Sequence, residues 1–200
     1  MGTAKTALAV ERNEKIAPRE RILAAAGDLF YHHGIRAVGV EAIAEAAGTN
    51  KMTLYRHFDS KDELVAEYLR ALAAKSEEGW SRWAAEFPGD ARAQLLAWLR
   101  AMGDHVGAAD TRGCALANAA VELPERDHPA RRVIEAVKKA QRDRLIELCN
   151  TAALTEPDML ADELFLLIEG ARVTAQCVGR DGLGARLVRM GEALIAAHQA

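Results

Sequence analysis

Residues 40–61 decide the fold of this chain and read VEAIAEAAGTNKMTLYRHFDSK. Ile43, Ala44 and Ala47 form an apolar set at helical spacing, and the two alanines are small enough to let a second helix approach closely. Gly48 follows at the point where a helix ends in the left-handed conformation, which glycine adopts without steric cost. The pattern predicts a short helix that is buried on one face and stops at a tight turn.

A second short helix is predicted over residues 51–57, because Asn50 is a favourable N-cap. Leu54 and Phe58 are four residues apart and would face inward. The outward side chains offer cations, hydroxyls and an aromatic ring without a carboxylate, and they are Lys51, Met52, Thr53, Tyr55, Arg56 and His57. A short helix with a donor-rich face that lacks acids suits the major groove of DNA.

This stretch resembles the helix-turn-helix signature of the tetracycline-repressor (TetR) family. The matching residues are Ile43-Ala44, Ala47-Gly48, Thr53-Leu54-Tyr55, His57-Phe58 and Ser60-Lys61-Asp62-Glu63-Leu64. The resemblance covers roughly the first third of the chain, and spacing and residue type match together. It implies a dimeric transcriptional regulator with an N-terminal domain that binds double-stranded operator DNA. A larger helical domain would bind a small-molecule effector that alters the affinity for DNA.

The chain departs from the family pattern at three places, which are Val38-Gly39-Val40, Thr49-Asn50 and Met52. These positions would touch bases or phosphates, so the departures concern the operator sequence rather than the motif. The expected DNA contacts are nine side chains in and around the motif, namely Arg36, Thr49, Lys51, Met52, Thr53, Tyr55, Arg56, His57 and Lys61. By resemblance and fit to the groove, Lys51, Met52 and Tyr55 would touch base edges. The residues that would hold phosphates are Thr53, His57 and Lys61. Arg56 could do either, and Arg36 is open between a phosphate contact and a solvated loop charge.

Composition favours an all-α fold, since half of the 200 residues are apolar, only 5% are aromatic, and no strand-like alternation of any length occurs. The net charge is −3, but residues 1–61 carry nine Lys and Arg against seven Asp and Glu, and the remainder carries 17 against 22. Three widely spaced cysteines without a CxxC motif favour reduced thiols. No signal sequence or membrane-length apolar run is evident, so we expect a cytoplasmic protein that makes no membrane contact.

The chain is predicted to have three parts: a tail (1–17), a helix-turn-helix DNA-binding domain (18–74) and a ligand-binding and dimerisation domain (75–200). The tail favours disorder, with a basic DNA-contacting arm as the alternative. Pro18 opens a helix to about His33 that supports the motif. Ser60 and Glu63 form a capping box for a helix that continues toward Phe87 and joins the two domains.

Five further helices are expected in the second domain. They lie over about 91–107, in the run that begins at Cys114 and is ended by Pro124, over about 129–153, from Thr155 to about 178, and after Gly184 to about His198. Thr155 is the expected cap of the helix to about 178. Its residues 164–168 are apolar on all sides and are therefore predicted to be buried all round, with one face against a second subunit. By resemblance, the last two helices would pair with their symmetry mates in a homodimer. The alternative is that they cap the core of a monomer.

The candidate ligand-binding residues are large, aromatic or polar side chains of the second domain, namely Trp80, Trp83, Trp98, Met102, His105, Asn118, Phe165, Glu169, Arg172 and Gln176. Tryptophan and methionine are more often core residues than ligand walls. Glu169 and Arg172, three residues apart on an otherwise apolar helix, would pair with each other, meet the other subunit or face a ligand.

No motif for catalysis, a metal or a cofactor is found, because the chain lacks a phosphate-binding glycine loop, a nucleophile elbow and HExxH. The pairs Asp104-His105 and Asp127-His128 are interpreted as surface charges rather than metal ligands. The sequence therefore favours a repressor released from a palindromic operator by its effector. The alternative is an all-helical small-molecule binder or enzyme that keeps a non-functional helix-turn-helix. In that case the outward face of residues 51–57 should have acquired carboxylates or large apolar side chains, and only Met52 points in that direction.

Overall fold

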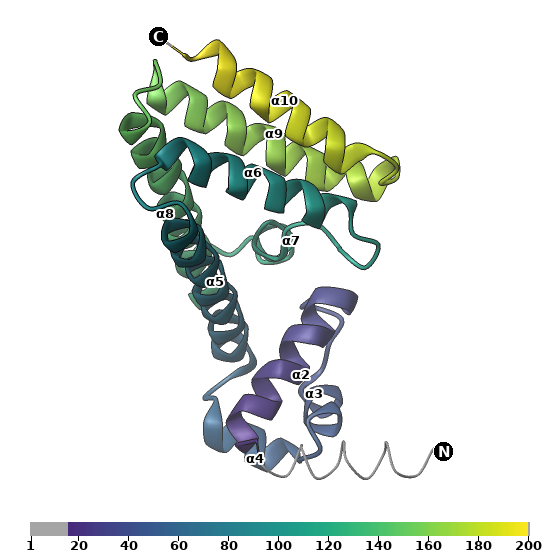
Figure 1. Ribbon diagram of the computed structural model, residues 1–200. Helices are drawn as coiled ribbons and strands as arrows, with labels where there is room; N and C mark the ends of the chain where they lie inside the picture. Colours follow the sequence, from purple (N-terminus) through teal and green to yellow (C-terminus); the bar gives the residue numbers. More distant parts are fainter. Residues whose placement is uncertain (1–15, 200) are drawn as a thin grey trace, which may run out of the picture. The chain divides into compact units, whose positions relative to one another are not determined.

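A computed structural model describes residues 16–199, and these residues form helices connected by turns, with no strand among them (Figure 1). The predicted all-α class is confirmed. The N-terminal tail, predicted for residues 1–17, lies outside the described residues up to residue 15. The helices are α2 (Pro18–His33), α3 (Val40–Ala46), α4 (Lys51–His57), α5 (Lys61–Glu86), α6 (Ala91–Gly107), α7 (Ala115–Glu122), α8 (Pro129–Thr151), α9 (Pro157–Cys177) and α10 (Leu183–Ala197).

The chain divides into two compact units. The first comprises residues up to Ala71 together with Asn118–Val133, and the second comprises Leu72–Ala117 together with residues from Ile134 onward. The division into domains at 18–74 and 75–200 stays a proposal, to which the structure adds that residues 118–133 pack with the first unit. Three helices (α5, α7 and α8) therefore contribute residues to both units.

Apolar residues at helical spacing build the core of the first unit. Gly34 ends α2 with a φ of +87°, where its N–H donates to the carbonyl of Phe30. The ring of Phe30 packs against Tyr68 of α5, with 5.9 Å between centroids. The side chains that are at most 4% exposed include Ile22, Ala26, Phe30, Ile43, Ala44, Leu54, Phe58, Leu64, Val65 and Leu69. They come from α2, α3, α5 and the stretch from α4 to Phe58, so the helix-turn-helix is held on a packed support.

The second unit contains α6, α9 and α10 side by side (Figure 1). Glycine makes the approach of α6 to α10 possible. A Cβ atom added to Gly103 would lie 2.5 Å from Cγ2 of Val188 and 3.0 Å from the carbonyl oxygen of Gly184. A Cβ added to Gly191 would lie 2.6 Å from both methyl carbons of Leu99. The buried residues of α10 are Leu187, Gly191 and Ile195, and Gly191 lies against Leu99 of α6.

One prediction about α9 is wrong. Thr155 does not cap this helix, because its hydroxyl donates to the carbonyl of His198, and the N-cap is Glu156, which makes no capping hydrogen bond through its side chain. Within the single chain the apolar run is buried on one side, at Leu164 and Ile168, while Leu166 is 72% exposed, so burial of the other side by a second subunit stays a prediction. No helix among residues 16–199 is both long and apolar enough to cross a bilayer.

Candidate nucleic-acid interface and buried polar cluster

Short-range hydrogen bonds set the geometry of the helix-turn-helix. Gly48 adopts a φ of +62°, and the N–H of Thr49 donates to the carbonyl of Ala44 at 2.9 Å. The side-chain oxygen of Asn50 then accepts from the N–H of Thr53 at 2.9 Å, which satisfies one of the free amides at the start of α4. The turn and the cap are those that the sequence predicts.

The two sides of α4 differ sharply in exposure. Leu54 is fully buried and Phe58 is 2% exposed, so both anchor the helix. On the other side, Met52 is 74% exposed and Tyr55 is 43% exposed. The remaining predicted contacts on this helix are exposed or, for Thr53, partly exposed, and they are Lys51, Thr53, Arg56 and His57. The outward face of α4 is therefore open to a partner.

A carboxylate does reach this face, from the preceding helix. Nζ of Lys51 lies 2.7 Å from Oε1 of Glu41 on α3. The hydrogen bond from Lys51 holds the pKa of the Glu41 carboxyl below its usual value, and the same bond raises the pKa of Lys51. Both groups are exposed, so the pair is weak in solution. The prediction of a face without acids holds for α4 itself but missed this neighbour.

Lys61 opens α5 close to the motif in sequence. The hydroxyl of Ser60 accepts from the N–H of Glu63 at 3.0 Å, as the predicted capping box requires. The reciprocal half is absent, because the Glu63 carboxylate instead accepts from Arg70 at 2.7 Å. Lys61 makes no ion pair with any residue in the described range 16–199, which leaves its ammonium available to an anion.

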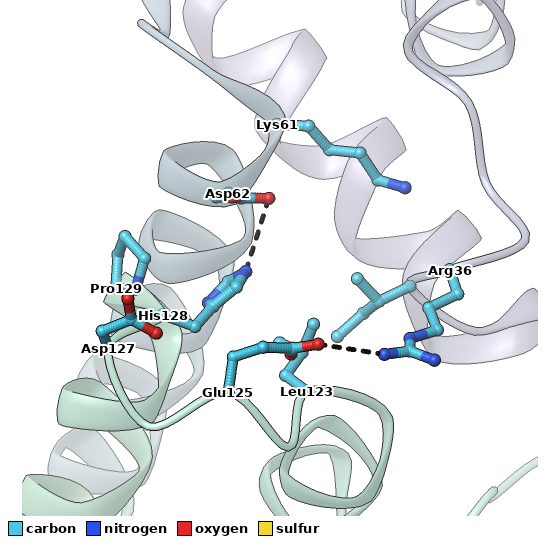
Figure 2. A pocket seen from close by; sticks show the side chains of 9 residues that line it. Arg36, Lys61, Asp62, Leu123, Glu125, Asp127, His128 and Pro129 are labelled. Atoms are coloured by element: carbon cyan, nitrogen blue, oxygen red, sulfur yellow. Dashed lines mark hydrogen bonds and ion pairs between the residues drawn. The ribbon is translucent and has the colours of Figure 1, made fainter.

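Arg36 has acidic neighbours, an arrangement not foreseen from the sequence. Its backbone N–H donates to Oε2 of Glu122 at 3.0 Å, and its guanidinium donates to Oε1 of Glu125 at 3.3 Å. Figure 2 shows this ion pair at an open hollow of about 460 Å³ within the first unit, lined also by Lys61. A phosphate contact through Arg36 would have to compete with Glu125.

His128 lies at the same hollow and is not a surface charge. Its side chain is 9% exposed, its Nδ1 accepts from the N–H of Ala130 at 3.1 Å, and its Nε2 lies 3.4 Å from Oδ1 of Asp62 (Figure 2). His105 is also partly buried, whereas Asp104 and Asp127 are exposed. The surface interpretation was thus right for the two acids and wrong for the two histidines.

The three candidate tryptophans gather at the start of the second unit. Trp80 stacks on Trp98 with 5.8 Å between ring centroids and meets Trp83 edge-on at 5.0 Å. Trp80 and Trp98 are 5% and 8% exposed and belong to the core of this unit. A ligand-contacting role for them stays a prediction.

A second group of candidates forms a polar cluster between α8 and α9. Glu169 accepts from Arg172 at 2.6 Å and from Lys138 at 2.9 Å, so the two residues singled out on α9 pair with each other and with a third. Burial disfavours the charge on Glu169, but the charges of Lys138 and Arg172 outweigh it and hold the pKa of the carboxyl below its usual value. The carboxylate is therefore ionised, as a buried acid between two cations should be.

Further candidates surround this cluster. Arg172 contacts Sδ of Met102 at 3.3 Å, and Lys138 lies 5.0 Å from the ring centroid of Phe165. Burial and then the charge of Arg172 lower the pKa of His105. Gln176 lies against Gly113, whereas Asn118 groups with the first unit.

Sequence reasoning missed Lys138 and Cys114, whose Sγ accepts from Lys138 at 3.3 Å. The signal for Lys138 was present, because it lies between Ile134 and Leu145 on the stripe that α8 buries, at offsets of four and seven. No comparable pattern points to Cys114. Among the described residues, no three His, Cys, Asp or Glu side chains gather as metal ligands.

Comparisons with known proteins agree with this geometry. The family model for bacterial regulatory proteins of the tetR family matches residues 22–68, which span α2 to the first turns of α5. The transcriptional repressor KstR2 of Rhodococcus jostii is 46% identical over 56 residues, and this match covers 28% of each chain.

Solved structures extend the similarity to nearly the whole chain. A putative TetR transcriptional regulator (sav143) of Streptomyces avermitilis is 32% identical, with a TM-score of 0.76, over 92% of this chain and 98% of that one. SCO4454, a TetR-family regulator of Streptomyces coelicolor, is 26% identical, with a TM-score of 0.85, over 92% and 96%. The similarity therefore includes the C-terminal unit as well as the motif.

Proposed function

Because this chain belongs to the TetR family of DNA-binding transcriptional regulators, we propose that it is a repressor that a small-molecule effector releases from a palindromic operator. The proteins of this family are regulators rather than enzymes. The name of KstR2 as a repressor supports the direction of regulation. The effector would favour a conformation in which the α4 helices of the two subunits no longer fit consecutive major grooves of the operator.

One observation carries the proposal of DNA binding: α4 buries Leu54 completely yet leaves Met52 and Tyr55 exposed beside basic side chains. The nine predicted DNA contacts stay proposals, of which Lys51 and Arg36 have carboxylate partners in this state. Lys61, at the start of α5, is proposed to hold a phosphate together with the free amides of that helix.

We propose a homodimer through α9 and α10, which an apolar stripe supports. Met159, Leu166 and Val173 are seven residues apart on α9, so they lie almost in line, and each is at least 50% exposed. Met190 of α10 is 51% exposed. A row of exposed apolar side chains on one helix is typical of an interface. A two-fold dimer would place the reading helices about 34–36 Å apart, one turn of DNA.

A gel-shift titration against the DNA that flanks the gene, at several stated salt concentrations, tests the proposal. Lys61→Ala should weaken binding to all DNA sequences and reduce the salt slope by about one. Lys75→Ala is the matched control, because Lys75 is an exposed lysine further along the same helix.

The result that contradicts DNA binding is the absence of a retarded band from low to moderate salt. If Lys61→Ala instead loses only its own operator and binds unrelated DNA normally, the phosphate role of Lys61 is wrong. Loss of binding in both lysine variants would also remove the assignment, since it would reflect net charge rather than position.

A further inference from the structure

The polar cluster of the second unit holds two cations around one carboxylate. Lys138 of α8 and Arg172 of α9 both donate to Oε1 of Glu169. Their side chains are 19% and 17% exposed, so little water is available to solvate them. His105 adds no compensating negative charge, because a histidine side chain is either neutral or positive. Because a charge removed from water must be paired, the two cations and one carboxylate leave one positive charge that a further anion would pair.

The hydrogen bonds show the same shortage of strong acceptors. Beyond Glu169, Arg172 donates only to Sδ of Met102, and its buried Nε has no partner among the described residues. Beyond Glu169, Lys138 donates to Sγ of Cys114. Thioether and thiol sulfur are weak acceptors. Lys138 and Arg172 therefore donate to sulfur atoms in a poorly hydrated site, where an oxyanion would be a stronger acceptor.

We propose that this cluster binds the acidic group of the effector, a carboxylate carried on an apolar body. The inference rests on the proposed function, in which the C-terminal unit binds a small molecule. Arginine presents paired N–H groups that match a carboxylate, and the lysine adds a second charge-assisted bond. The ring of Phe165 and the side chain of Met102 lie beside the cations and would contact the apolar body.

Isothermal titration calorimetry on the full chain tests the charge requirement with hexanoate and benzoate as probes. Hexanamide and benzamide have the same shapes without the charge. We expect the acids to bind and the amides to bind at least about tenfold more weakly, because only the carboxylate adds an attraction between opposite charges, which is strong where little water is present.

Three variants locate the site. Lys138→Gln and Arg172→Gln should each weaken acid binding by about tenfold or more and weaken amide binding much less. Lys139→Gln is the matched control, since Lys139 is an exposed neighbour that pairs with Asp143, and it should bind the acids normally. Glu169 keeps one cationic partner in either cluster variant, so both should fold, and circular dichroism checks this. If one variant does not fold, the other decides.

The proposal is overturned if the amides bind as tightly as the acids, if neither probe class binds, or if the folded cluster variants bind acids like the control. A gel shift run in parallel separates this failure from that of the proposed function. If a neutral compound releases the protein from its operator and the acids do not, the repressor function is supported and the acidic effector is contradicted. If the acids bind and this binding requires Arg172, but the protein binds no DNA, the acid-binding site is supported and the repressor function is contradicted.

Discussion

Replacing Gly103 by alanine should destabilise the C-terminal unit, because α6 and α10 approach each other more closely there than a side chain permits. The added Cβ would lie 2.5 Å from Cγ2 of Val188 and 3.0 Å from the backbone oxygen of Gly184. The valine methyl can shift only by moving a stiff β-branched side chain, and the carbonyl can shift only by moving α10. The two helices would have to separate.

The expected cost follows from two opposing effects. Overpacking of a tight contact costs about 1–3 kcal/mol. Alanine is favoured over glycine within a helix by about 1 kcal/mol, which offsets part of that cost. The net loss should be about 0–2 kcal/mol, which corresponds to a Tm lower by up to about 8 °C for a chain of this size.

Urea and thermal denaturation followed by circular dichroism, at one fixed protein concentration, would measure this loss. Gly107→Ala is the matched control on the same helix, because a Cβ at Gly107 meets nothing within 4 Å. This variant should be unchanged or up to about 1 kcal/mol more stable. If Gly103→Ala is as stable as Gly107→Ala, the close approach of α6 and α10 is not a feature of the folded protein.

Three further predictions concern charge, assembly and pH. Glu41→Gln should tighten DNA binding at low salt by about two- to fivefold in a gel shift, because it frees Lys51 and removes a negative charge that repels phosphate. Glu45→Gln on the same helix should change the affinity less. Leu166→Glu should give monomers in size-exclusion chromatography with light scattering, whereas Val121→Glu, at a residue that is also largely exposed, should leave the dimer intact. A dimeric Leu166 variant would contradict the interface. Because burial lowers the pKa of His105 below 6.5, the unfolded chain binds a proton that the folded chain does not, so the free energy of unfolding should fall as pH drops below about 6.5. His105→Asn should flatten that part of the stability–pH curve, and an unchanged curve would contradict the assignment.

Local sequence determined the helices and the motif. The bounds of α2, α4 and α6 match the predicted ranges, because Pro18, Gly34 and Asn50 act on the backbone within a few residues of themselves. The open face of α4 followed in the same way from the burial of Leu54 and Phe58. These are interactions whose two partners are close together in the chain, so a pattern reveals both.

Tertiary structure alone decided which charged groups meet. Arg36 pairs with Glu125, and Asp62 lies beside His128. The Glu169 carboxylate pairs with Lys138 of another helix. The exposed stripe on α9 also became visible only once one side of that helix had packed, since its sequence is apolar on every side. Ion pairs and exposed faces depend on how helices pack against each other, and that packing joins residues that are tens of positions apart. The spacing of residues along one helix carries no record of the partner.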